Sequence, residues 1–179
     1  KLYGDIMAGI VGLTELQHTN GTSAATIDAS GRISTPARPA FRAEKRASHQ
    51  SVTDGVITKI TFEHEAFDIG SNYDASNSKF VAPLAGIYHF NILLRGIANG
   101  GTMDYVQYFL YKNGSIYSDI IQMQTSANNM ANSHLGGGLT VQLAASDEIE
   151  VYGAISGTSP AFHSHASGQR TWFSGFLIG

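Results

Sequence analysis

The stretch that decides the fold runs from Lys79 to Phe90 and reads Lys79-Phe80-Val81-Ala82-Pro83-Leu84-Ala85-Gly86-Ile87-Tyr88-His89-Phe90. Pro83 fixes its φ angle and Gly86 tolerates a positive φ, so these residues predict a turn. After the turn, apolar and polar residues alternate, which is the period of a strand with one buried face. The apolar positions of this strand are Tyr88, Phe90, Ile92 and Leu94. The stretch therefore predicts a turn that leads into a core strand.

Short apolar runs separated by Gly, Asn, Asp and Ser continue on both sides of this stretch, from Ala40 to Gly179. One of them, residues 139–143, alternates apolar and polar or small residues in the same way. Asn113-Gly114 stands between two apolar runs and predicts a hairpin, because both residues accept left-handed backbone geometry. The pattern predicts an all-β fold, an antiparallel sandwich or barrel.

Two of the predicted strands carry apolar side chains on both faces. The first has Met103, Tyr105, Phe109 and Tyr111 on one face and Val106, Tyr108 and Leu110 on the other; in the second, Trp172, Phe176 and Ile178 oppose Phe173 and Leu177. The outer face of a lone two-layer sandwich meets water, so a second apolar face indicates burial against another subunit. The alternative is that the N-terminal extension covers this face within one chain, and both explanations can hold in part.

Several of these runs carry a family resemblance that spans residues 41–179. The stretch quoted above is its most specific part, and the others are Thr61-Phe62, Asn72-Tyr73-Asp74, Leu110-Tyr111-Lys112-Asn113-Gly114, Asp147-Glu148-Ile149-Glu150-Val151 and Thr171-Trp172-Phe173-Ser174-Gly175-Phe176-Leu177-Ile178. In order and spacing they resemble the globular head of complement component one, subcomponent q (C1q). The resemblance implies an antiparallel jelly-roll sandwich of about ten strands, related to tumour necrosis factor, that forms a homotrimer and recognises ligands through its loops.

The N-terminal residues 1–39 are expected to form an attachment or assembly segment, separate from the jelly-roll head in residues 40–179. Pro36 and Pro39 end regular structure and place the boundary. Before the boundary, residues 26–33 predict two short extended pieces about a turn. A helical spacing, weakened by three glycines, predicts a short helix or an attachment segment, and it is shared by Leu2, Tyr3, Ile6, Ile10, Leu13 and Leu16.

A second resemblance covers residues 21–33 within this segment. These residues are similar to the leader segments that precede such heads in structural proteins of marine bacteriophages. No Gly-X-Y repeat stands before the head in this sequence, so the collagen stalk of the animal relatives is not expected. The two resemblances together imply a protein of the virion surface.

The composition narrows the classes of partner. The formal net charge is -3 and the sequence pI is about 6.1, without the basic excess that nucleic acid or an anionic membrane surface would attract. No apolar stretch is long enough to span a bilayer, so membrane insertion is not expected. The chain has no cysteine, which excludes disulfides, thiolate metal sites and cysteine nucleophiles.

The stretch His163-Ser164-His165 has a spacing of histidines that is typical of metal ligands. On an extended segment, residues two apart project to the same face, so His163 and His165 from three chains would bring six imidazoles around a threefold axis. Such a cluster suits an octahedral transition metal. The competing explanation, a solvated pair of loop histidines, is favoured because two ligands specify little. No other cofactor is expected.

The carboxylates do not indicate catalysis. A glycoside hydrolase needs an acid and a base or nucleophile in one cleft. Glu63 and Glu65 alternate with Phe62 and His64. Glu148 and Glu150 alternate with apolar residues in the same way, so all four are interpreted as exposed charges on strands. The chain is therefore expected not to be an enzyme, and an enzymatic tailspike remains the third hypothesis.

For binding, three polar loops are the candidates, because loops on a rigid sandwich usually carry recognition. They are Ser71 to Ser78, Thr125 to His134, and Gly157 to Gln169. The sequence thus predicts a non-enzymatic, homotrimeric virion surface protein, a tail fibre or receptor-binding head that contacts a glycan or protein of the host surface. The alternative is a capsid decoration protein or a subunit of an extracellular filament, with a purely structural role and with other subunits bound through residues 1–39.

Overall fold

The computed structural model describes residues 12–125, 130–168 and 170–179. The chain divides into two compact units, Lys1–Arg38 and Pro39–Gly179. Only strands and irregular segments occur in the described ranges, with no helix among them. Across these ranges no helix has the length and apolar character needed to cross a membrane.

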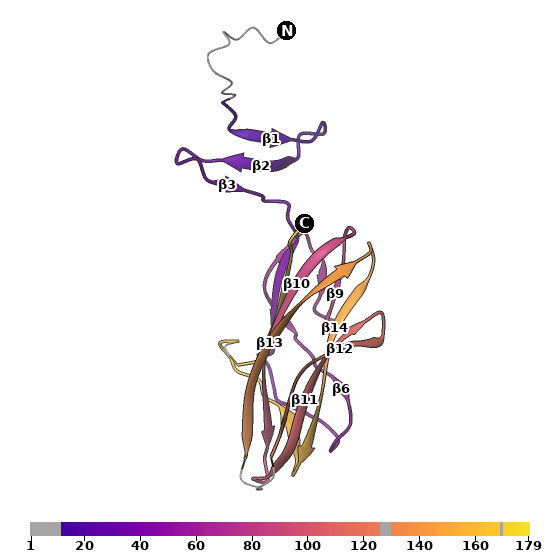
Figure 1. Ribbon diagram of the computed structural model, residues 1–179. Helices are drawn as coiled ribbons and strands as arrows, with labels where there is room; N and C mark the ends of the chain where they lie inside the picture. Colours follow the sequence, from indigo (N-terminus) through magenta and orange to yellow (C-terminus); the bar gives the residue numbers. More distant parts are fainter. Residues whose placement is uncertain (1–11, 126–129, 169) are drawn as a thin grey trace. The chain divides into compact units, whose positions relative to one another are not determined.

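The N-terminal unit contains a three-stranded antiparallel sheet in the order β1-β2-β3 (Figure 1). Its strands are β1 (Glu15–Gln17), β2 (Ser23–Ile27) and β3 (Ile33–Ser34). The predicted pair of extended pieces about a turn in residues 26–33 is therefore confirmed. Most residues of the predicted helix lie outside the described ranges. At its C-terminal end the prediction of a helix is wrong, because Leu16 is in strand β1 and pairs with Ala25.

The second unit is a sandwich of two antiparallel sheets, and the predicted all-β jelly-roll sandwich is confirmed (Figure 1). The seven-stranded sheet follows the path β5-β15-β10-β16-β4-β7, with β13 on the other side of β10. Its strands are β4 (Ala40–Glu44), β5 (Gln50–Ser51), β7 (His64–Ile69), β10 (Gly86–Ala98), β13 (Asn132–Leu143), β15 (Pro160–Phe162) and β16 (Trp172–Leu177).

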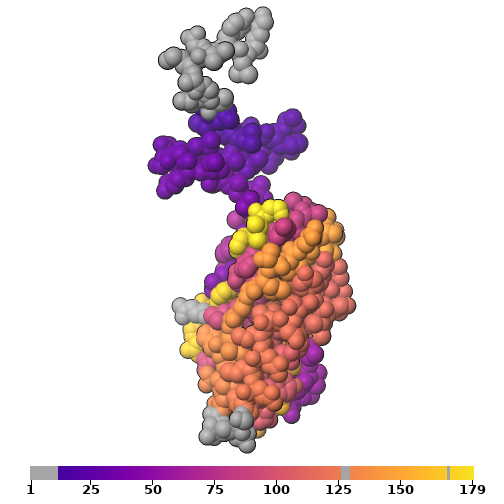
Figure 2. Space-filling model, in the orientation of Figure 1, coloured from indigo at the N-terminus to yellow at the C-terminus, as the bar shows by residue number. Residues whose placement is uncertain are grey.

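The six-stranded sheet follows the path β12-β11-β14-β9-β8, and β6 pairs with β14 beside it. Its strands are β6 (Thr58–Lys59), β8 (Tyr73–Asp74), β9 (Lys79–Val81), β11 (Met103–Lys112), β12 (Ser115–Gln124) and β14 (Glu148–Gly157). The predicted hairpin joins β11 to β12, and Asn113 and Gly114 both have positive φ angles (51° and 77°). Figure 2 shows β12 and β13 side by side on one face of this unit.

The alternation that the sequence predicted for β10 is present. Tyr88, Phe90, Ile92 and Leu94 are buried, and the alternate residues His89, Asn91 and Leu93 are partly exposed. The buried side chains meet aromatic rings from the other sheet. Phe41 on β4 lies 4.9 Å from Phe80 on β9, measured between ring centroids. Aromatic contacts across the two layers therefore form the centre of the core.

Two glycines allow this close packing. Gly86 does not adopt the predicted positive φ; instead, a Cβ atom there would lie 2.7 Å from Cδ1 of Leu177. Gly175 faces the ring of Phe90, and a Cβ atom there would also lie 2.9 Å from Cε1 of Phe41. The predicted close approach of a ring at Gly175 is confirmed. Both positions are glycine because a neighbour occupies the space of a side chain.

The two strands predicted to be apolar on both faces differ from each other. On β11, the ring of Tyr111 stacks on Tyr152, with centroids 3.8 Å apart. The hydroxyl of Tyr105 donates a hydrogen bond of 3.2 Å to the carbonyl oxygen of Gly55, so a segment of the same chain covers part of the second face. On β16, Phe176 stays 42% exposed. In the described chain, the uncovered apolar face is thus the one on β16.

Replacing Gly175 by alanine is expected to lower the free energy of unfolding by about 1–3 kcal/mol, because the added methyl group overpacks the centre of the core. Gly179→Ala is the matched control, since nothing lies within 4 Å of a Cβ atom at that position. Urea unfolding followed by the fluorescence of Trp172, the one tryptophan of the sequence, measures the effect. Identical unfolding curves for the two variants would contradict the packing argument.

Candidate functional site

A row of imidazole and guanidinium groups crosses the outer face of the seven-stranded sheet. Arg95 on β10 lies opposite His134 on β13. The amide of His163 donates a hydrogen bond of 2.8 Å to the carbonyl oxygen of Arg95, which places His163 next in the row. The ring of His49 lies beside it, with centroids 4.0 Å apart. The row therefore joins four segments that are distant in the sequence.

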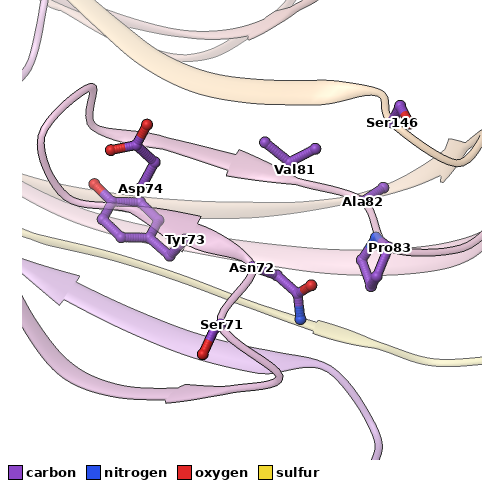
Figure 3. Close-up of a pocket in the computed structure, with 8 residues that line it drawn as sticks. All are labelled: Ser71, Asn72, Tyr73, Asp74, Val81, Ala82, Pro83 and Ser146. Carbon is purple, nitrogen blue, oxygen red and sulfur yellow. The ribbon is translucent and has the colours of Figure 1, made fainter.

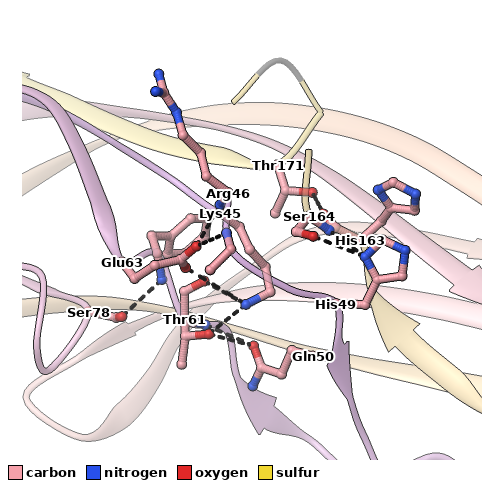
Figure 4. A network of polar contacts seen from close by, with 12 residues as sticks. Lys45, Arg46, His49, Gln50, Thr61, Glu63, Ser78, His163, Ser164 and Thr171 are labelled. Atoms are coloured by element: carbon pink, nitrogen blue, oxygen red, sulfur yellow. Dashed lines mark hydrogen bonds and ion pairs between the residues drawn. The ribbon is translucent and has the colours of Figure 1, made fainter. Parts of the chain in front are cut away.

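The two predicted metal ligands have different neighbours. Figure 4 shows the ring of His163 beside His49, whose Nδ1 shares a hydrogen bond of 3.0 Å with the Ser164 hydroxyl. His165 instead shares a hydrogen bond of 2.7 Å with Ser167. No group of three or more histidine or carboxylate residues that could hold a metal occurs in the described part of one chain. A metal bound by His163 and His165 on a trimer axis would need ligands from other copies, and it stays a prediction.

The electrostatics of the row keep His163 neutral. Burial lowers the pKa of His163 to about 4, and the neighbouring His49, Arg95 and Arg170 act in the same direction. The Nδ1 atom of His163 is buried without a hydrogen-bond partner. None of the ion pairs between described residues includes Arg95 or Arg170. The row thus carries positive charge without a carboxylate to offset it.

A polar network next to the row is structural (Figure 4). Lys45 is 4% exposed, and its ammonium group donates a hydrogen bond of 2.8 Å to the Thr61 hydroxyl. Glu63 accepts hydrogen bonds from the backbone amides of Arg46 and Ala47, at 2.6 and 2.5 Å. The pKa of Lys45 lies below its usual value, because the effect of burial, which lowers it, exceeds that of the Glu63 charge, which raises it. The side chain of Glu63 thus holds the turn that follows β4.

Two of the other predicted strand carboxylates, Glu148 and Glu150, are also used in ion pairs, whereas Glu65 is exposed on β7. Glu148 lies 2.6 Å from the ammonium group of Lys79. Glu150 was expected to be exposed, but it is 8% exposed and pairs with Lys59, so that expectation is corrected. The reason is that β6 places Lys59 opposite Tyr152 on β14, where its side chain covers the carboxylate. These groups hold β9 and β6 against β14.

The predicted loop Ser71 to Ser78 lines a shallow hollow of about 310 Å³ (Figure 3). Val81, Ala82, Pro83 and Ser146 complete its wall. The Asp74 carboxylate accepts hydrogen bonds from Asn77 and Ser76, which lower the pKa of Asp74 to about 2. Since these bonds lie within the loop, the carboxylate stabilises the turn that shapes the hollow.

The described parts of the other two predicted loops contribute to the opposite end of the sandwich, about 40 Å away along the thirteen residues of β10. Residues 126–129 and 169 of these loops lie outside the described ranges. This far end is defined here by residues 99–102, Thr125 and residues 158–159. The hydroxyls of Thr102 and Thr158 share a hydrogen bond of 3.2 Å. The Thr125 hydroxyl donates one of 2.7 Å to the carbonyl oxygen of Met103. The side chains of the far end are uncharged, and they are hydroxyls and amides of the kind that bind sugars.

Sequence reasoning missed two parts of these sites. His49 and Arg95 belong to no motif, and only the pairing of β5, β15 and β10 brings them to His163. The turn at residues 99–102 could have been found, because Asn99-Gly100-Gly101 is a turn signal between two apolar runs.

A comparison of the sequence with protein families gives a result that agrees with the two-layer sandwich. The family model of the C1q domain matches residues 40–178. The chain belongs to the C1q domain family. The match covers the second unit, and the resemblance noted in the sequence to the C1q head is thereby confirmed.

Solved structures of C1q and tumour necrosis factor type share the fold. The globular domain of zebrafish complement 1qA protein superposes with a TM-score of 0.56 at 16% identity, over 79% of this chain and 98% of that chain. Eiger TNF from S. frugiperda gives a TM-score of 0.61 at 10% identity, over 79% and 93%. Murine APRIL gives 0.57 at 12% identity, over 79% and 99%.

Among curated proteins, the C1q-family chain is similar to the phage-like element PBSX protein XkdV of Bacillus subtilis (strain 168). The two are 28% identical over 137 residues, which cover 73% of this chain and 20% of that protein. The chain therefore spans about one fifth of the length of this relative.

The low pKa of His163 makes stability depend on pH. The ring is neutral in the folded protein down to about pH 4, whereas in the unfolded chain it takes up a proton near its usual pKa of 6.5. The free energy of unfolding should therefore fall as the pH falls from 6.5 toward 4. His163→Gln should flatten this part of the curve, because it removes the group that titrates. Thermal unfolding at several pH values measures the effect, and equal slopes for the wild type and His163→Gln would contradict it.

Proposed function

We propose that the protein is a non-enzymatic, homotrimeric protein of the virion surface, a tail fibre or receptor-binding head that contacts the host. Residues 1–39 attach it to other virion subunits, and the head in residues 40–179 carries recognition. The ligand is a glycan or a protein of the host surface, and the location is extracellular.

The observation that carries this proposal is the distance, within the head, between the residue where the chain enters and the polar loops of the far end. The chain enters the head at Ala40, which pairs with Phe176 beside the C-terminus. The far end lies at the other end of β10, where β11 starts and β14 ends (Figure 1). A head held through Ala40 presents uncharged hydroxyl and amide groups away from its attachment. Loops on a rigid sandwich are a usual place for ligand recognition.

A contiguous apolar patch on the outer face of the seven-stranded sheet supports the homotrimer. The patch is formed by side chains that are each 41–48% exposed, namely Phe67, Ile69, Ile87, Phe176 and Ile178. The register places Ala40 between Phe176 and Ile69, so three strands contribute to one surface. An apolar surface of this kind indicates a protein interface. Domains of the C1q and tumour necrosis factor families form homotrimers. We propose that the patch is the surface through which copies of this head associate.

The virion context is supported by the relative from a phage-like element and by the leader-like residues 21–33. C1q-type domains are structural or ligand-binding modules, which supports a role without catalysis. The ion pairs of Glu148 and Glu150 agree with that role, because carboxylates held by lysines are not free for acid–base chemistry.

The second candidate is a capsid decoration protein or a filament subunit without a receptor. It is favoured by the exposed apolar side chains of the N-terminal unit, Leu13, Leu16 and Ile33, which are available to other subunits. The two functions differ in whether the far end binds anything.

Phe176→Asp is expected to convert the full-length trimer into monomers, because three carboxylates would be buried in an apolar interface. Ile57→Asp is the matched control, since Ile57 has the same 42% exposure but precedes β6, outside the patch. Light scattering coupled to size-exclusion chromatography gives the mass of each variant. A Phe176→Asp trimer, or a monomeric wild type, would overturn the proposed interface.

Thr158→Arg is expected to weaken binding of the trimer to host cells by about tenfold, equal to about 1.4 kcal/mol, because it crowds the far end with a charged side chain. Ser76→Arg is the control, on the loop beside the 310 Å³ hollow. Binding of labelled trimer to a panel of bacterial cells and surface polysaccharides measures both. If only Ser76→Arg lost binding, the recognition surface would be the hollow. If the wild type bound nothing, the structural role would be favoured.

A further inference from the structure

The three-stranded sheet of the N-terminal unit has one apolar and one polar face. Leu16 lies opposite Ala25, and Ile27 lies opposite Ile33. Ala25 and Ile27 are two residues apart on β2, so all four side chains point to the same side of the sheet. Leu16 is 60% exposed and Ile33 is 70% exposed. The described residues of this unit leave the apolar face open.

The opposite face is polar and internally bonded. The hydroxyls of Thr26 and Ser34 share a hydrogen bond of 2.6 Å. The charges of the adjacent turn are also paired, because the guanidinium group of Arg32 lies 2.7 Å from the Asp28 carboxylate. The apolar face itself carries no charged side chain, so identical faces from several copies can approach without like-charge repulsion.

A sheet this small has no core of its own. Its strands have three, five and two residues, and such a sheet is stable only when its apolar face is covered. Five residues, 35–39, join β3 to β4, and they reach at most about 18 Å. Ala40, the first residue of β4, lies within the apolar patch of the head. In the proposed trimer, the three N-terminal sheets are therefore held close together, at a high effective concentration.

We propose that the apolar faces of three N-terminal sheets from three copies of the chain pack against one another, so that Leu16, Ala25, Ile27 and Ile33 form an intersubunit core. The occupant of each face is thus the same face of two further copies of this chain. This inference rests on the homotrimer of the proposed function. Residues 12–34 then continue the trimer as a second assembly domain.

The absence of cysteine from the sequence allows a direct test by cross-linking. Ile33→Cys and Ser34→Cys are introduced singly into the full-length chain. These neighbouring positions point to opposite faces of β3, which makes them a matched pair. A short bismaleimide should join chains of the Ile33→Cys trimer into dimers on a denaturing gel. Ser34→Cys should give several-fold less dimer, because its thiols point away from the proposed intersubunit core.

A second measurement uses the trypsin site at Arg32. Ile33→Asp should expose the N-terminal sheet and raise the rate of cleavage after Arg32 several-fold, whereas Ser34→Asp should leave it unchanged. Light scattering on the same samples reports whether the head remains trimeric. Equal cross-linking of the two cysteine variants, or equal cleavage of the two aspartate variants, in a chain that is still trimeric would overturn this inference alone. A monomeric wild type would overturn the homotrimer of the proposed function with it.

Discussion

The contact of aromatic rings across the two sheets is the constraint on which the head depends. Phe41 on β4 meets two rings of the other sheet, Phe80 on β9 and Tyr73 on β8, with ring centroids 4.9 and 5.0 Å apart. This contact fixes the distance between the layers, and it requires glycine at position 175 because the ring of Phe90 fills the place of a side chain. Once the layers are fixed, the register of each strand decides which side chains meet water. The patch, the basic row and the far-end turns all follow from that register.

The outer face of the seven-stranded sheet changes character along its length. Near the start of β4 it is apolar, with Phe176 and Ile87 exposed. Further along β10 it becomes basic, with Arg95 and His163 in one row. Apolar surface favours association without direction, whereas unpaired positive charge opposes the approach of an identical surface. Contact between copies is therefore expected to be centred on the apolar part, with the neutral form of His163 limiting the repulsion in the basic part.

Much of the fold could be predicted from the sequence because it depends on local patterns. Alternation revealed the buried face of β10, and Asn113-Gly114 marked the hairpin that joins β11 to β12. The candidate site was predicted less well, because its parts meet only through pairing between distant strands. His163 was found from its spacing to His165, but its real neighbours, His49 and Arg95, come from other strands. Gly86 shows a similar limit: the residue type indicated a turn, while the cause of the glycine is the nearby Leu177 side chain.

The far end consists of turns that contribute nothing to the aromatic core and lie outside the apolar patch. A substitution in residues 99–102 or at Thr158 changes neither the spacing of the sheets nor the surface proposed for self-association. If the far end contacts the host as proposed, host range can diverge in these few positions while assembly is inherited unchanged. Related virions that infect different hosts would then share one scaffold and differ chiefly at its tip.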